Sequence, residues 1–223
     1  MMAHAISIPG ACISYHKFTQ RRLRSNTRIS VSLTHAEEVK LEYTPWLFVG
    51  LGNPGNKYHG TRHNVGFEMI DCIAQQEGIS LNTIQSKALI GIGSIGEVPV
   101  LLAKPQTYMN FSGESIYDEM SLPNGVLRLQ AKGGHGYHNG MKSVMDQLDN
   151  SREFPRLSIG IGNHPGTMDM RAYLLQKFSA EEREQINAAL KQGVEGVRSL
   201  VFKGFDDSIN RFNLRQKYKY HKV

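Results

Sequence analysis

The chain has 223 residues, 40% of them hydrophobic, which suits one α/β domain with an extension rather than two full domains. No apolar run approaches the roughly 18 residues that a membrane helix needs, so we expect no membrane partner. The two cysteines, Cys12 and Cys72, are far apart and lack the spacing of metal ligands. This pattern favours free thiols in a reducing compartment.

The net charge of +6 is concentrated at the N-terminus. Residues 1–36 contain no Asp or Glu and have five basic residues; the rest of the chain keeps 21 of the 26 Lys and Arg against 20 acids. The segment is also rich in Ser and Thr. Such a composition is typical of an organellar transit peptide, which we predict for residues 1–40 with cleavage within 30–40. A disordered basic arm that binds RNA is the alternative.

Hydrophobic patterns predict strands and helices in alternation after this leader. Trp46–Leu51 is a nearly continuous apolar run, as in a strand buried on both faces. A helix is predicted from about Thr61 to Glu77, closed by Gly78. The elements predicted further along are a hairpin with strands at 88–93 and 98–103, strands at 126–130 and 157–162, a helix starting near Met141, and a long helix opened by a Ser179–Glu182 capping box.

Polar side chains with complementary chemistry stand next to the glycine-rich turns. They are Asn53, His63 with Asn64, Asn110 in Tyr108-Met109-Asn110, and His138 with Asn139, and Asp118 adds a carboxylate. No Ser or Cys stands in a nucleophile elbow. These groups fit a mechanism in which an imidazole is the general base for a water, a carboxylate orients it, and amides bind carbonyl oxygens. This chemistry suits ester or amide hydrolysis without a covalent intermediate.

A metal site built from His63, His135 and His138 is the alternative at these turns. These histidines lack the i, i+4 pairing that two ligands on one helix have. We therefore predict no metal and no cofactor.

Four ordered motifs carry a family resemblance. They are Gly-Leu-Gly-Asn-Pro-Gly at 50–55 with Thr-Arg-His-Asn-Val-Gly at 61–66, Lys-Pro-Gln-Thr-Tyr-Met-Asn-Phe-Ser-Gly at 104–113, Asp-Glu at 118–119, and Gly-Gly-His-Gly-Tyr-His-Asn-Gly at 133–140. From about Trp46 to Phe205 the chain resembles bacterial-type peptidyl-tRNA hydrolase. The resemblance implies a single α/β domain with a mixed β-sheet flanked by helices. It also implies cleavage of the ester between a peptide and the 3′ end of tRNA.

The resemblance assigns roles to the residues that match. His63 would be the general base, Asp118 would hold it in its basic form, and Asn53 would contact the peptide part of the substrate. The remaining positions would line the tRNA and peptide site: Tyr58, Tyr108, Met109, Asn110, His138 and Asn139. Each residue alone has an ordinary structural interpretation as well, such as a turn, a helix cap or core packing.

Several segments look like a plant branch of the family, which facilitates the splicing of chloroplast group IIB introns. They include Thr-Pro-Trp-Leu-Phe-Val-Gly at 44–50 and Arg-Phe-Asn-Leu-Arg-Gln-Lys at 211–217. The resemblance implies a location in the chloroplast stroma, partner proteins with a CRM RNA-binding domain, and tRNA or intron RNA as ligand, in a monomer or small complex. Two functions remain open: a peptidyl-tRNA hydrolase, or a non-catalytic splicing facilitator.

The chain departs from the family pattern around Asp118. Met120-Ser121 replaces a Leu-Asp pair, and only residues 114–117 lie between Gly113 and Asp118. The family has a helix and a central strand there, and even a short crossover with its helix takes about 10–12 residues. About sixteen residues are missing by that resemblance, which predicts a skipped exon or an imperfect gene prediction and a chain that folds poorly.

The last segment, 206–223, is predicted to be a basic tail. Residues 211–223 contain five basic residues and two interleaved tyrosines, with no acid. Basic and aromatic residues together are typical of a contact with single-stranded RNA. A solvated terminus is the alternative.

Overall fold

The computed structural model describes residues 5–8, 11–14, 45–107, 116–136, 138–217 and 219. The chain divides into two compact units, residues 1–45 and residues 46–223. In the first unit, β1 (Ala5–Ile8) and β2 (Ala11–Ser14) form an antiparallel pair. The transit peptide at 1–40 stays a prediction.

The second unit contains two β-sheets. The first has the order β3-β6-β5-β4, made of β3 (Trp46–Val49), β4 (Thr83–Gln85), β5 (Ala88–Ile95) and β6 (Val98–Pro105). β3 runs parallel to β6, and the other pairs are antiparallel. The predicted hairpin is confirmed by β5 and β6, which turn at Gly96 with a φ of 59° that suits glycine.

The second sheet has the order β7-β9-β8, made of β7 (Ile116–Glu119), β8 (Leu127–Gln130) and β9 (Arg156–Gly160). β7 pairs with β9 in parallel, from Ile116 with Leu157 to Glu119 with Gly160. A short strand is therefore present at Ile116–Glu119, whereas the loss of residues before Asp118 stays a prediction. Four residues are enough to continue the ladder beside β9, and they place Asp118 in it.

The α/β class with mixed sheets and flanking helices is confirmed, but the described strands of this unit lie in two sheets rather than in one. β3 and β7 are each four residues long and are edge strands of their own sheets. So short an edge offers few backbone groups for a ladder between the two sheets.

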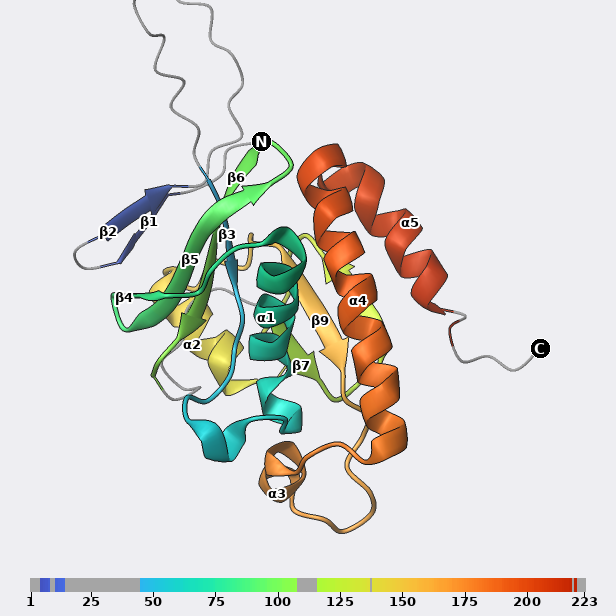
Figure 1. The fold of residues 1–223 in the computed structure, drawn as a ribbon. Coiled ribbons are helices and arrows are strands. Elements are labelled where there is room, and N and C mark those ends of the chain that lie inside the picture. Colours follow the sequence, from blue (N-terminus) through green and yellow to red (C-terminus); the bar gives the residue numbers. More distant parts are fainter. Residues whose placement is uncertain are drawn as a thin grey trace, which may run out of the picture. The chain divides into compact units, whose positions relative to one another are not determined.

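Helices cover both faces of the first sheet (Figure 1). The helices in the described part of this unit are the 3₁₀-helices η1 (Asn56–Tyr58) and η2 (Arg62–Asn64), and α1 (Val65–Glu77), α2 (Asn139–Gln147), α3 (Met170–Leu175), α4 (Ala180–Lys203) and α5 (Phe205–Lys217). Of these, α5 packs on β8 of the second sheet and α3 lies against η2. α1 and α4 share a core with Phe48 and Leu102, whereas α2 packs on Val49 and Ala103. Because successive strand residues point to opposite faces, these alternating positions place α2 opposite α1.

The predicted helix ends are largely confirmed. α1 begins at Val65 rather than Thr61 because residues 62–64 form η2, and it ends at Gly78 in the left-handed conformation with φ 67°. The Ser179–Glu182 capping box opens α4. No helix in the described part of the chain combines the length and hydropathy needed to cross a membrane.

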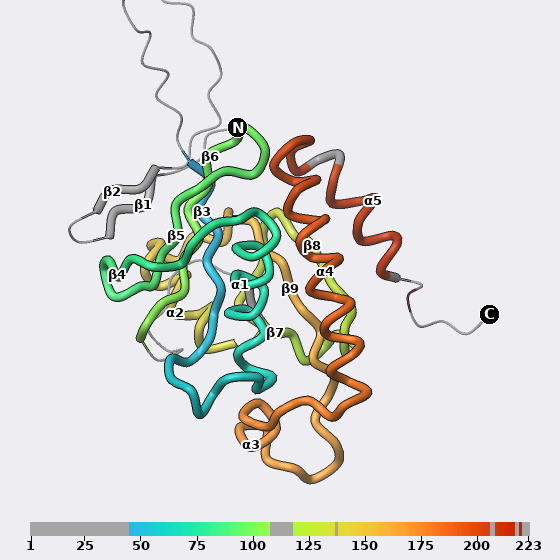
Figure 2. The backbone as a smooth tube through the Cα atoms, viewed as in Figure 1, coloured from blue at the N-terminus to red at the C-terminus, as the bar shows by residue number. Residues whose placement is uncertain are grey.

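α5 has no counterpart among the predicted elements, and it closes the free edge of β8. Figure 2 follows the backbone from α4 into this helix, and Gly204 is the C-cap residue of α4. The Asn213 carboxamide accepts from the Leu129 N–H at 2.9 Å and donates to the Leu129 carbonyl at 2.8 Å. Gln216 Oε1 accepts from the Leu127 N–H at 3.2 Å. Side chains of α5 thus occupy backbone groups that a further strand would use.

Candidate active site

The site begins where β3 passes into the glycine turn at 50–55. A Cβ on Gly50 would collide with the Gly66 carbonyl, and one on Gly52 would lie 2.6 Å from the Phe67 ring. The turn can therefore approach the first turn of α1 only because these positions are glycines. This close approach brings Asn53 and His63 to the same end of the fold.

Asn64 fixes the main chain of Asn53. The Asn64 Oδ1 accepts from the Asn53 N–H at 2.9 Å, and Asn64 Nδ2 donates to the Asn53 carbonyl at 2.8 Å. Both residues are buried, so these two bonds satisfy groups that water does not reach. Asn64 thereby holds the backbone from which the Asn53 side chain projects.

Arg62 anchors η2, which contains His63. Its guanidinium is buried, donates to Glu182 Oε2 at 2.8 Å, and lies 4.3 Å from the Tyr173 ring centroid. Its backbone N–H donates to the Gln176 carbonyl at 3.0 Å. η2 is thus tied to the segment between α3 and α4, and His63 has a fixed support.

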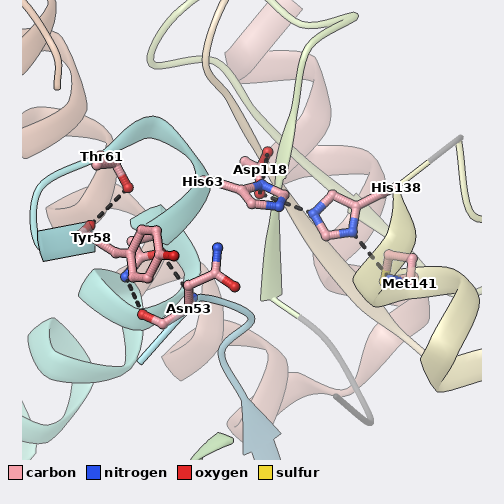
Figure 3. A network of polar contacts seen from close by, with 8 residues as sticks. Asn53, Tyr58, Thr61, His63, Asp118, His138 and Met141 are labelled. Atoms are coloured by element: carbon pink, nitrogen blue, oxygen red, sulfur yellow. Dashed lines mark hydrogen bonds and ion pairs between the residues drawn. The ribbon is translucent and has the colours of Figure 1, made fainter. Parts of the chain in front are cut away.

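Asp118 joins two histidines from different elements (Figure 3). Nδ1 of His63 lies 3.0 Å from each carboxylate oxygen, and Nε2 of His138 lies 3.0 Å from Oδ1. The Asp118 residue is only 3% exposed. In the view of Figure 3 the Asn53 side chain lies between the Tyr58 ring and the His63 imidazole.

Hydrogen-bond partners set the tautomers of both histidines. Nδ1 of His138 accepts from the Met141 N–H at 3.1 Å and so caps α2, which leaves the proton on Nε2 to be donated to Asp118. The ionised Asp118 can only accept, so Nδ1 of His63 also donates to it. Nε2 of neutral His63 then holds a lone pair, and no residue in the described ranges hydrogen-bonds to it.

The shared carboxylate shifts the pKa values of this cluster. Burial alone would raise the pKa of Asp118, but the charges and hydrogen bonds of His63 and His138 hold it well below its usual range. Burial alone would lower the pKa of His63, but the Asp118 charge and hydrogen bond raise it above the ordinary value of 6.5. The site therefore combines a carboxylate that is ionised at neutral pH with an imidazole whose basicity that carboxylate increases.

His63, Asp118 and His138 also have ligand atoms within 4.8 Å of one another, as in a metal site. His138 would have to bind a metal through Nε2, whose proton is committed to Asp118 while Nδ1 caps α2. A neutral imidazole has no further lone pair to offer. The contacts therefore fit a hydrogen-bonded His–Asp–His cluster better than a metal centre.

The other predicted residues are placed as follows. Tyr58 is half-buried in η1, where Lys57 Nζ lies 4.7 Å from its ring centroid. Asn139 is exposed as the first residue of α2. Tyr108, Met109 and Asn110 lie outside the described residues.

Three features of the site were missed from the sequence. They are the clamp by Asn64, the support by Arg62, and the contact of His138 with Asp118. The His-Asn pairs at 63–64 and 138–139 are the available signal, because each combines an imidazole with a carboxamide beside a helix start. The sequence does not indicate which partner each member contacts.

Three comparisons relate the chain to known proteins. The family model of peptidyl-tRNA hydrolase matches residues 47–117 and 115–221. The chloroplastic group IIB intron splicing facilitator CRS2-B of Arabidopsis thaliana is 64% identical over 230 residues, which cover 94% of this chain and 96% of that protein. The chloroplastic peptidyl-tRNA hydrolase of the same plant is 51% identical over 189 residues, which cover 77% of this chain and 66% of that protein.

A solved structure supports the same relationship. The peptidyl-tRNA hydrolase of Acinetobacter baumannii is 32% identical, with a TM-score of 0.71 over 76% of this chain and 94% of that one. The family match, the relatives and the fold agree with one another. The chain therefore belongs to the peptidyl-tRNA hydrolase family.

Proposed function

We propose that this chain is a chloroplast member of the family that retains an ester-hydrolysis site and facilitates the splicing of group IIB introns. The proposed ester hydrolysis is supported mainly by the His63–Asp118 contact, which leaves Nε2 of His63 available as a base. The similarity to the Arabidopsis facilitator supports the splicing half.

In the proposed reaction, Nε2 of His63 takes a proton from a water as that water attacks the ester carbonyl of peptidyl-tRNA. Asp118 stabilises the imidazolium that forms. The acyl C–O bond breaks, the imidazolium returns the proton to the departing 3′ oxygen of the tRNA, and the peptide is formed as a carboxylic acid that loses its proton to the solvent. Asn53 is positioned by Asn64 to hydrogen-bond the peptide part of the substrate.

In the splicing role, the protein would bind intron RNA together with partners that carry a CRM RNA-binding domain, in the chloroplast stroma. A non-catalytic facilitator is the second candidate. The observation that favours it is the order of the identities: 64% to the Arabidopsis facilitator against 51% to the chloroplastic hydrolase of the same plant. A site can stay intact for binding after catalysis has been lost.

Cleavage of an N-acetylated aminoacyl-tRNA by the recombinant chain tests the catalytic half. We expect His63→Ala to lower kcat/KM by about 10²–10⁴, the usual contribution of a general base. His59→Ala removes an exposed imidazole nearby and serves as the matched control. If the unaltered chain cleaves no ester while it co-purifies with intron RNA and a CRM-domain protein from chloroplasts, the non-catalytic function replaces the catalytic one.

A further inference from the structure

A groove of about 580 Å³ lies between α4 and α5, on residues that the ester site does not use. Its lining includes four basic side chains, Lys203, Arg211, Arg215 and Lys219, and one acidic side chain, Glu195. The volume is within the range of about 300–1,000 Å³ that accommodates drug-sized molecules, which is large enough for a nucleotide.

The walls of the groove are fixed before any ligand binds. Phe212 packs against Gly196, where an added Cβ would lie 2.7 Å from its ring, so the two helices meet closely. Asn213 and Gln216, which also lines the groove, are bonded to β8 and hold α5 in place. Lys219 Nζ donates to the Gly125 carbonyl at 2.6 Å and to Gln192 Oε1 at 2.7 Å, which holds the end of the segment.

The charge of the groove is strongly positive. Residues 191–219 contain seven basic and three acidic residues. Glu195 is paired with Arg198 at 3.1 Å, which offsets its charge. Lys203, Arg211 and Arg215 are exposed, and the described part of the chain provides no ion pair for any of them.

Arg211 and Arg215 are four residues apart on α5 and so lie on one face of the helix. Together with Lys203 from α4 they line the same groove as the half-buried Phe212 ring. A positive groove combined with an aromatic side chain is how proteins bind single-stranded nucleic acid.

We propose that the α4–α5 groove binds the phosphate backbone of single-stranded RNA. This inference rests on the proposed function, for which it supplies a second RNA contact. α4 runs from the ester site to the groove. Near its start Glu182 pairs with Arg62, which is next to His63 in sequence. Glu195, which lines the groove, is 13 residues further along the helix. At about 1.5 Å per residue the groove starts about 20 Å from that pair. An RNA strand in the groove therefore leaves the ester site open.

Fluorescence anisotropy with a labelled oligouridylate of about twenty nucleotides tests the groove in the full chain. The test variant is Arg211→Gln with Arg215→Gln. Lys191→Gln removes a charge from an exposed position of α4 that does not line the groove, and is the matched control. Each phosphate contact to a single strand contributes about −0.7 to the slope of log affinity against log salt concentration. The loss of one contact therefore weakens binding about fivefold at 0.1 M salt.

We expect the double variant to bind about 25-fold more weakly at 0.1 M salt, with a salt slope smaller by about 1.4. The control should bind like the unaltered chain, and all three proteins should unfold at the same temperature. If the double variant and the unaltered chain bind with equal affinity, the proposal that the groove binds RNA is wrong, while the proposed function is unaffected. Displacement of the RNA by polyglutamate as effectively as by unlabelled oligouridylate would indicate an acidic protein segment as the occupant, and would also overturn it.

Discussion

Nδ1 of His63 lies 3.0 Å from both carboxylate oxygens of Asp118, and this contact decides how the cluster titrates. Asp118 raises the pKa of His63 because its charge stabilises the imidazolium. His138 donates to the same carboxylate and so competes with His63 for its negative charge. The two neighbours of His63 should therefore shift its titration in opposite directions when each is removed.

Asp118→Asn removes the charge that strengthens the base. Hydrolysis needs the neutral imidazole, so kcat/KM falls as the pH drops through the pKa of His63. Without the carboxylate, burial lowers that pKa, and we expect the acidic limb of the pH profile to move to lower pH. The plateau should fall by about 10²–10⁴. Asp146→Asn, at an exposed position of α2, is the control, and an unmoved acidic limb would contradict the assignment of Asp118.

His138→Asn should act in the other direction. Asparagine can still cap α2, but it is too short to replace the contact with Asp118. The carboxylate then attracts the imidazolium more strongly, so the pKa of His63 rises and the acidic limb moves to higher pH. We expect kcat/KM near neutral pH to fall about tenfold, as for the loss of one hydrogen bond to a charged group.

The comparison with His138→Ala separates the cap from the carboxylate contact. Loss of the cap should cost the alanine variant about 1 kcal/mol of unfolding free energy, measured by urea denaturation, whereas the asparagine variant should keep it. If both variants have the pH profile of the unaltered chain, then His138 does not tune the base.

Much of the fold could be predicted because it depends on local patterns. The apolar run at Trp46, the αL glycine at 78 and the Ser179–Glu182 box each report a strand or helix end without knowledge of the tertiary structure. α5 could not be predicted in this way, because what holds it is a pair of carboxamides that meet β8 more than 80 residues away in sequence.

The sequence was sufficient to predict which residues form the site, but not which of them contact each other. His63 and Asp118 were assigned to each other through the family resemblance, and they do lie in contact. His138 was expected among the substrate-binding residues, and its bond to Asp118 became visible only when β7 and the start of α2 were placed together. Long-range contacts of this kind leave no periodic signal in the sequence.

Asn213→Leu tests whether α5 stabilises the edge of β8. The substitution leaves both the N–H and the carbonyl of Leu129 without their partner, and we expect a loss of about 2–4 kcal/mol in the free energy of unfolding. Urea denaturation measures the loss, and hydrogen exchange should be faster at the Leu129 amide. Asn210→Leu, exposed on the same helix, is the control. Equal stability of the two variants would mean that water satisfies β8 as well as Asn213 does.

The short connection before Asp118 leads to the last prediction. The family match breaks into two parts that meet at 115–117, and the alignment with the Arabidopsis facilitator spans 230 positions, more than the 223 residues of this chain. Both observations agree with a missing segment that would lengthen β7 and add backbone hydrogen bonds beside it. We expect that inserting the facilitator's segment after Gly113 stabilises the protein by a few kcal/mol.

For a chain of this size each kcal/mol shifts the unfolding temperature by about 2–4 °C, so the insertion should raise it by about 10 °C in calorimetry. A scrambled segment of the same composition controls for length, and it should give no gain because it cannot extend the ladder. The opposite result has a clear signature. If the chain without the insertion unfolds cooperatively with an enthalpy near 0.7 kcal/mol per residue, its core is already complete, and the four residues of β7 are sufficient to hold Asp118 against His63.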